Sequence, residues 1–344
     1  MKIIITEDNH ELREIIKNRL SQESYIDIIG IAQDIFSLKS LIMSEKPEVL
    51  IIDIELIGLD GMEFLRRFIQ QENIAVIAIT SQTQKGKHLA LQTLELGVLD
   101  FVIKPPTDIQ KGIESMLSEL TIKLKSVPKA KIKNLNVDNQ FGNARKPEAI
   151  IKDEQILKNK IIVIGSSTGS IPFLKKFLTQ LPPEIPGMIV ITDLPAGFTK
   201  TFADRLNEIS KVKIREAVNK DNFKPGRVLI APGDLHTKVF KIGNRFEVVV
   251  ENGEKINGQR PSIDVLMHSV AEQAPNLTIG VLLSGNIADG IHGFLEMKRA
   301  GSKNILVDKT NLVFDELVSS ASELRAADFT VKPDMLIDKI LELV

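Results

Sequence analysis

The chain has 344 residues, which is long enough for two ordinary domains with separate cores. Its formal net charge of −1 at pH 7 provides no overall field that would attract nucleic acid or a membrane surface, and the absence of cysteine excludes disulfides and thiolate metal sites. No apolar run approaches the roughly 18 residues of a membrane span, and the N-terminal run is too short for a signal peptide. We therefore expect a cytoplasmic protein that binds no nucleic acid and does not insert into a membrane.

Short apolar runs alternate with amphipathic stretches over residues 1–121. The runs have the composition of buried strands, and the stretches between them, such as Glu11–Leu20 and Leu89–Leu96, have the spacing of helices. Five such units predict a doubly wound α/β domain, with an open parallel sheet and helices on both faces. The expected strands are Ile3–Ile5, Ile26–Ile31, Val49–Ile52, Ile74–Ile79 and Leu99–Ile103.

Charged and hydroxyl side chains follow the ends of four of these strands, where parallel sheets collect their functional groups. They are Glu7 and Asp8, then Asp53, Thr80 and Lys104. Three converging carboxylates repel one another unless a hard cation lies among them, and Mg²⁺ prefers carboxylates, water and phosphate oxygens. The pattern predicts a Mg²⁺ site where Asp53 receives a phosphoryl group that Thr80 and Lys104 bind. For any single residue, the alternative is a helix cap or a solvated charge.

On these residues, the segment 1–121 resembles the receiver domain of two-component response regulators. The resemblance implies a flavodoxin-like fold in which Asp53 is phosphorylated. The positions that match the Mg²⁺ ligands are Glu7, Asp8, Asp53 and the backbone carbonyl of Glu55. The positions that match the phospho-switch are Thr80, Lys104 and Phe101.

Residues 122–158 have no sustained helical or strand period. Basic residues outnumber acidic ones, and Pro128, Gly142 and Pro147 interrupt the stretch. The composition predicts a basic, flexible linker that lets one domain cover and uncover the other. A nucleic-acid-binding arm is the alternative, but Phe141 is the one aromatic residue there to stack on a base.

Residues 159–344 predict a second doubly wound, mostly parallel α/β domain. Amphipathic helices are expected over Ile171–Leu181 and Asp264–Glu272. Two polar–apolar runs, Thr237–Ile242 and Arg245–Val250, flank Gly243-Asn244 and predict a β-hairpin. The other expected strands are Ile161–Ile164, Met188–Thr192, Arg227–Ile230, Leu277–Leu283 and Asn304–Val307.

A Gly-x-Ser-x-Gly turn, Gly165-Ser166-Ser167-Thr168-Gly169, follows the first of these strands and precedes a helix. Such a turn presents its middle hydroxyl at the sheet edge, beside the free amides of the helix. Ser167 is therefore a candidate nucleophile with an anion site next to it. A turn that binds a phosphate, or binds nothing, is the alternative.

Several segments of this second domain resemble the catalytic domain of the chemotaxis protein-glutamate methylesterases, the CheB family. Besides the serine turn they are residues 194–199 (Leu-Pro-Ala-Gly-Phe-Thr), 228–236, 260–266 and 282–290. The resemblance implies a Rossmann-like domain without a cofactor of its own. It also implies a monomer that hydrolyses glutamate methyl esters, and deamidates glutamines, on methyl-accepting chemoreceptors. The implied phosphodonor is the chemotaxis histidine kinase.

In that family a serine attacks the ester, a histidine takes its proton and an aspartate orients the histidine. Ser167 matches the serine and Asp289 the aspartate, whereas Asp193 stands where the family has its histidine. The backbone amides at Thr168 and Asn286 match the positions of the oxyanion donors. We therefore expect Ser167, Asp289, Asp193 and Thr168 to form the esterase site.

Asp193 leaves two hypotheses open. A carboxylate with a pKa near ~4 is a weaker base than an imidazole, and a second carboxylate facing Asp289 would raise the pKa of one of the two. The chain is either an active methylesterase or a catalytically degenerate CheB-like regulator that acts by phospho-dependent binding. A metal held by Asp193, Asp289 and His236 is a further alternative. The chain has five histidines, of which His10 and His88 belong to the receiver segment and His236, His268 and His292 to the CheB-like segment that needs a base.

Overall fold

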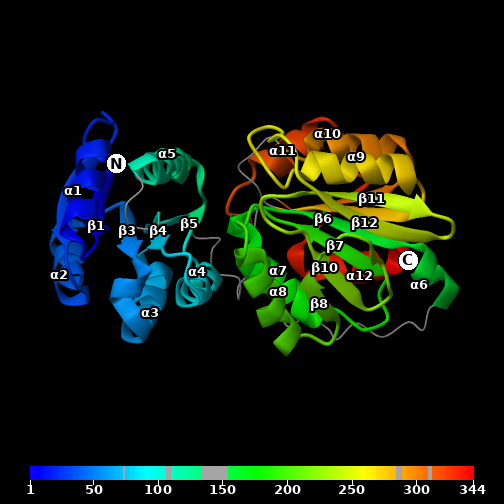
Figure 1. Ribbon diagram of the computed structural model, residues 1–344, viewed down its shortest axis with the longest axis horizontal. Helices are drawn as coiled ribbons and strands as arrows, with labels where there is room; N and C mark the ends of the chain where they lie inside the picture. The colour runs from blue at the N-terminus through cyan, green and yellow to red at the C-terminus, as the bar shows by residue number, and fades with distance from the viewer. Residues whose placement is uncertain (73, 106–109, 133–153, 284–288, 309–311) are drawn as a thin grey trace. The chain divides into compact units, whose positions relative to one another are not determined.

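The computed structural model describes residues 1–72, 74–105, 110–132, 154–283, 289–308 and 312–344. The chain forms two compact units, residues 1–136 and 137–344, and each has a central sheet with helices packed against it (Figure 1). Among the helices in these ranges, none combines the length and the apolarity that crossing a bilayer requires.

The first unit contains a five-stranded parallel sheet in the order β2-β1-β3-β4-β5. This confirms the predicted doubly wound fold, with strand ends displaced by about one residue. Helix α1 packs against α5, and α3 packs against both α2 and α4. The strands are β1 (Lys2–Thr6), β2 (Asp27–Ala32), β3 (Val49–Asp53), β4 (Ala75–Thr80) and β5 (Asp100–Ile103). The helices are α1 (His10–Leu20), α2 (Ile35–Glu45), α3 (Ile54–Glu72), α4 (Gln84–Leu96) and α5 (Gln110–Ser126).

The inner strands explain why this sheet forms. Strands β3 and β4 are buried along their whole length, as expected for strands covered on both faces. Helices α1 and α4 begin at side-chain caps, because Asn9 accepts the Leu12 N–H and Thr83 accepts the Gly86 N–H. Strands β3 and β4 therefore carry polar residues only at their carboxyl ends, Asp53 and Thr80.

The predicted linker is helical at both ends. Helix α5 continues to Ser126 because Leu120 and Leu124, one turn apart, are fully buried, and a 3-10 helix follows over Val127–Lys129. Lys123 and Lys125, on either side of Leu124 in the sequence, obscure the apolar period of this helix. At the far end, α6 occupies Glu154–Asn159. Residues 133–153, which include Phe141 and Pro147, lie outside the described residues.

The second unit contains a seven-stranded parallel sheet in the order β15-β14-β13-β6-β7-β10-β8. Helices α7 and α8 lie on one side of it, and α9 and α10 lie on the other (Figure 1). The strands are β6 (Ile161–Gly165), β7 (Gly187–Ile191), β8 (Lys213–Glu216), β10 (Arg227–Ile230), β13 (Thr278–Leu282), β14 (Lys303–Val307) and β15 (Phe329–Val331). The helices are α7 (Ile171–Gln180), α8 (Phe198–Ile209), α9 (Ile263–Gln273), α10 (Ile291–Arg299), α11 (Glu316–Glu323) and α12 (Leu336–Leu343), with short 3-10 turns at Thr168–Ser170 and Pro333–Met335.

A separate antiparallel sheet, β11-β12-β9, contains the predicted hairpin. Its strands are β9 (Asp221–Asn222), β11 (His236–Ile242) and β12 (Arg245–Glu251), and Ile242 pairs with Arg245 across Gly243-Asn244 as expected. Three strands have no counterpart in the sequence prediction: β8, β9 and β15. They are short or polar, and β8 and β15 are the edge strands of the large sheet, where burial imposes no apolar pattern.

Candidate functional site

The acidic residues at the edge of the first sheet converge on one point. One carboxylate oxygen from each of Glu7, Asp8 and Asp53 lies within 4.8 Å of the others. Glu7 and Asp53 are buried, with 0 % and 2 % exposure, whereas Asp8 is exposed. Oxygen donors that combine two buried carboxylates with an open side fit a hard cation such as Mg²⁺, which keeps several waters.

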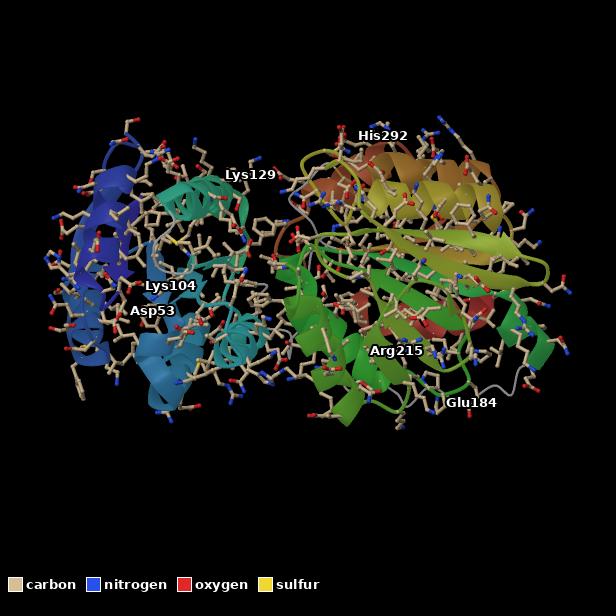
Figure 2. All side chains as sticks on the ribbon, viewed as in Figure 1. Asp53, Lys104, Lys129, Glu184, Arg215 and His292 are labelled. Carbon is tan, nitrogen blue, oxygen red and sulfur yellow. The ribbon has the colours of Figure 1, made fainter. Side chains whose placement is uncertain are left out.

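Lys104, which follows β5, neutralises part of this acidic cluster. Its Nζ lies 2.5 Å from Oδ2 of Asp53 and 3.0 Å from Oε2 of Glu7. Figure 2 shows Asp53 and Lys104 near each other at one end of the sheet. The N–H of Glu55 donates to Oδ1 of Asp53 at 3.0 Å, so both oxygens of Asp53 have a donor.

The pKa values follow from burial and from charge. Burial, followed by the charge of Asp53, raises the pKa of Glu7 to about 7 against the opposing effect of Lys104. Burial also raises the pKa of Asp53, although the hydrogen bond and charge of Lys104 act against it. Burial alone would lower the pKa of Lys104, but its contacts with Asp53 and Glu7 outweigh this and raise it. A second cation among these carboxylates would favour their ionised forms.

The switch candidates lie on the neighbouring strands. The Thr80 hydroxyl donates to the carbonyl of Gly86 in α4 at 3.0 Å, which connects the end of β4 to that helix. Phe101, in β5, is 1 % exposed. The Lys123 ammonium lies 5.5 Å from the centre of its ring and donates to its carbonyl oxygen at 2.6 Å. This arrangement holds the Phe101 ring inside the unit.

The serine turn in the second unit follows the buried strand β6. Ser167 is extended, with φ −114° and ψ 174°, and the 3-10 turn Thr168–Ser170 leads from it directly into α7. Ser167 and Thr168 are 2 % and 6 % exposed, so the hydroxyl lies within the unit rather than on its surface. A Cβ on Gly169 would lie 3.9 Å from Oγ of Ser167 and 3.2 Å from the ring of Phe314, so glycine keeps the space beside the hydroxyl open.

Strands β13, β6 and β7 are parallel neighbours, so they end side by side at one edge of the sheet. Ser166 donates its N–H to the carbonyl of Ile191, the last residue of β7, at 3.1 Å. Asp193 follows two residues later and is half-buried. The loop after it packs closely on the loop after β10, where a Cβ on Gly233 would lie 2.4 Å from the carbonyl carbon of Pro195.

Asp289, 1 % exposed, binds the N-terminus of α9. Its Oδ1 accepts the Ser262 hydroxyl at 2.7 Å and the Asp264 N–H at 3.2 Å, and its Oδ2 accepts the Ile263 N–H at 2.6 Å. Burial raises the pKa of Asp289 more than these hydrogen bonds lower it. Asp264 in turn accepts the N–H of Gly293 in α10 at 2.7 Å. Asp289, which precedes α10, thus caps the N-terminus of α9, and Asp264, in α9, caps the first turn of α10.

All five histidines lie in the described ranges. His236 is 4 % exposed, and both of its nitrogens have partners: Nδ1 accepts the Ser262 N–H at 3.3 Å, and Nε2 lies 2.7 Å from the carbonyl oxygen of Glu254. His268 is exposed and pairs with Glu296 at 2.6 Å. His292 lies at the outer surface of the second unit (Figure 2). His10 and His88 are exposed residues of the first unit.

Comparison with known proteins agrees with this geometry. The family model described as CheB methylesterase matches residues 162–340, and the response regulator receiver domain matches residues 3–114. The chain is 35 % identical over its full length to a protein-glutamate methylesterase/protein-glutamine glutaminase of Syntrophotalea carbinolica, covering 98 % of that protein. A relative of the same name from Sulfurimonas denitrificans is 36 % identical, covering 100 % of this chain and 98 % of the relative.

The chain belongs to the CheB methylesterase family. Among solved structures, the catalytic domain of CheB methylesterase from Thermotoga maritima superposes with a TM-score of 0.52 and 34 % identity. That likeness covers 54 % of this chain and 99 % of the Thermotoga domain. The recognition from sequence motifs, including a receiver domain ahead of a CheB domain, is therefore confirmed.

Within the CheB domain, Ser167, Asp193 and Asp289 come after the neighbouring strands β6, β7 and β13. Sequence reasoning missed that Asp289 binds the first turn of α9 through Ser262, Ile263 and Asp264. One signal was present, since a serine directly before an apolar helical pattern is a typical N-cap. The partner of that cap, 27 residues away, has no local signature. The expected oxyanion donor Asn286 lies outside the described residues.

Proposed function

We propose that this chain is a phosphorylation-regulated methylesterase that hydrolyses glutamate methyl esters on chemoreceptors and deamidates glutamines there. The observation that carries the proposal is the Ser167 turn between a buried strand and a helix N-terminus. Asp193 and Asp289 come after the two strands that flank β6. The names of the full-length relatives support the same activity. The substrate is the side chain of a methyl-accepting chemoreceptor, and the protein acts as a monomer in the cytoplasm.

Ser167 is the nucleophile in this proposal. Its Oγ forms a bond to the ester carbonyl carbon as its proton passes to the base position, held here by Asp193. The carbonyl oxygen becomes an oxyanion beside the backbone amide at Thr168, at the start of the 3-10 turn that leads into α7. Methanol leaves with the proton, and water then releases the glutamate from the serine ester. Asp289 acts as the carboxylate of the site from its place at the N-terminus of α9.

The receiver domain supplies the regulation. Asp53 accepts a phosphoryl group from the chemotaxis histidine kinase, with Mg²⁺ held by Glu7, Asp8, Asp53 and the carbonyl of Glu55. When bound, the cation neutralises charge on the carboxylates and on the arriving phosphoryl oxygens. Lys104 is already 2.5 Å from the acceptor oxygen and pairs with the phosphoryl group. Thr80 and Phe101 transmit the phosphorylation of Asp53 to α4 and β5, respectively.

Methanol release from methylated receptor membranes tests the esterase. Release is expected from the wild-type chain and not from Ser167→Ala, while Ser166→Ala, at the neighbouring buried hydroxyl, keeps a measurable rate. Equal release from wild type and Ser167→Ala contradicts the proposal. Incubation with Mg²⁺ and a small phosphodonor tests the receiver, because labelling is expected to disappear in Asp53→Ala and to persist in Asp100→Ala.

A phospho-dependent binding protein without ester chemistry is the alternative that Asp193 raises, and the full-length relatives named as methylesterases do not favour it. A carboxylate with a pKa near ~4 accepts the serine proton poorly at neutral pH. His236 has both ring nitrogens engaged, so it does not take over the base position that Asp193 holds. Asp193→His separates the two candidates. A wild type as active as the histidine variant excludes the binding protein, whereas an inert wild type and an active variant establish it.

A further inference from the structure

The first residue of α9 touches both loops that carry the esterase chemistry. Ile263 is 3 % exposed and lies between two glycines from distant parts of the chain. A Cβ on Gly165, two residues before Ser167, would lie 2.6 Å from Cγ2 of Ile263. A Cβ on Gly290, directly after Asp289, would lie 2.7 Å from the same atom. One methyl group therefore contacts the backbone of both loops.

The backbone of Ile263 makes the second connection. Its N–H donates to Oδ2 of Asp289 at 2.6 Å, so the residue holds the Asp289 carboxylate with its amide while its side chain rests on Gly165. The N-terminus of α9 is itself fixed, because Ser262 caps it and donates to the same carboxylate. The position of Cγ2 relative to the amide is rigid, since a β-branched side chain has one preferred rotamer in a helix.

We propose that Ile263 is a positioning residue whose β-branched methyl group sets the separation between the Ser167 turn and the Asp289 loop. This inference rests on the proposed esterase function and adds the residue that aligns its two halves. The spacing is sensitive, because both glycines allow a closer approach than any other residue would. Removal of Cγ2 leaves a gap into which either loop relaxes. A misplacement of about 1 Å costs about 10²-fold in rate in well-aligned sites.

Two substitutions separate the methyl branch from simple bulk. Ile263→Val keeps Cγ2 and loses only the terminal methyl, whereas Ile263→Leu keeps the volume and loses the branch at Cβ. In methanol release from methylated receptor membranes, Ile263→Val is expected to keep kcat near the wild-type value. Ile263→Leu is expected to lower kcat about 10²-fold with KM unchanged, because Ile263 is 3 % exposed and its side chain is not available to a bound receptor. Equal kcat for the two variants overturns the proposal.

If the wild type releases no more methanol than Ser167→Ala, the esterase proposal fails. Thermal unfolding of the full chain then still tests whether the contact between Ile263 and Gly165 sets the spacing of the two loops. Gly165→Ala places a Cβ against Cγ2 of Ile263 and is expected to lower the unfolding temperature of the second unit. In an Ile263→Ala background the same change is expected to cost less, because the 2.6 Å contact with Cγ2 has gone and only the 3.1 Å contact with Cδ1 of Leu282 remains.

Gly187→Ala is the matched control at the start of β7. Its Cβ would lie 2.8 Å from the backbone nitrogen of Lys224 and would not meet Ile263, so its effect should be the same in both backgrounds. A Gly165→Ala loss that Ile263→Ala does not relieve shows that the contact with Ile263 does not set the spacing, and the inference then fails whatever the activity of the chain.

Discussion

The carboxylate of Asp289 is expected to stabilise the second unit independently of catalysis, and Asp289→Asn measures that contribution. The substitution keeps the shape of the side chain but replaces one acceptor oxygen by an NH2 group. Oδ2 accepts the Ile263 N–H at 2.6 Å, and Oδ1 accepts both the Ser262 hydroxyl and the Asp264 N–H. Whichever way the amide turns, at least one buried donor then faces another donor.

The magnitude follows from these contacts. A buried donor without an acceptor costs about 1–3 kcal/mol, and the lost attraction between the carboxylate and the N-terminus of α9 costs about 0.3–2 kcal/mol. Part of this is offset because asparagine carries no charge to bury, and the raised pKa of Asp289 shows that burial opposes its ionised form. The net loss is expected to be about 2 kcal/mol. For a unit of this size the unfolding temperature should fall by about 4–8 °C.

Scanning calorimetry of the full chain measures the shift, and hydrogen exchange with mass spectrometry assigns it. Backbone amides in the first turn of α9 are expected to exchange faster in Asp289→Asn, whereas those of the first unit keep their wild-type rates. Asp234→Asn is the matched control, because Asp234 is exposed at φ 61°, a conformation that asparagine tolerates. A second unit that unfolds within 1 °C of wild type in Asp289→Asn would refute the reasoning about the cap.

Three further outcomes are expected. Lys104→Met should lower the unfolding free energy of the first unit by about 3 kcal/mol, because two buried carboxylates lose their cation. Urea titration followed by the fluorescence of Tyr25, the single tyrosine, measures this loss. An unchanged urea midpoint counts against a stabilising ion pair. His236→Ala should lower the transition temperature of the second unit in calorimetry, since the Ser262 N–H loses its acceptor; an unaltered transition shows that this hydrogen bond does not stabilise the unit. The hydrogen bond to Glu296 raises the pKa of His268 above 6.5. The charges of Glu296 and Glu272 raise the pKa further, whereas burial and the charge of Lys238 lower it. The stability from this pair is therefore complete below about pH 6.5 and is lost as the pH rises through the raised pKa, a slope that His268→Gln should flatten in melting curves between pH 6 and 8.

Much of the fold and part of the site follow from the sequence. Buried strands of a parallel sheet favour near-continuous apolar runs, so Val49–Ile52 and Ile161–Ile164 can be recognised from the local sequence. Because such strands all end at one edge, the residues that follow them, such as Asp53 and Ser167, are predictable candidates. The same pattern fails for β8 and β15, since edge strands need no apolar period.

Only the tertiary structure decides which groups those candidates bind. The sequence shows that Asp193 stands where the CheB family has a histidine, but not that His236 is engaged on both nitrogens and unable to replace it. It likewise places Asp289 in a loop without revealing that α9 supplies its donors, or that one methyl group of Ile263 touches both loops. Local patterns record the burial and backbone preference of each residue in turn. A hydrogen bond or van der Waals contact between segments that are 26 or more residues apart depends on how the helices and strands pack, and nothing in either segment alone encodes it.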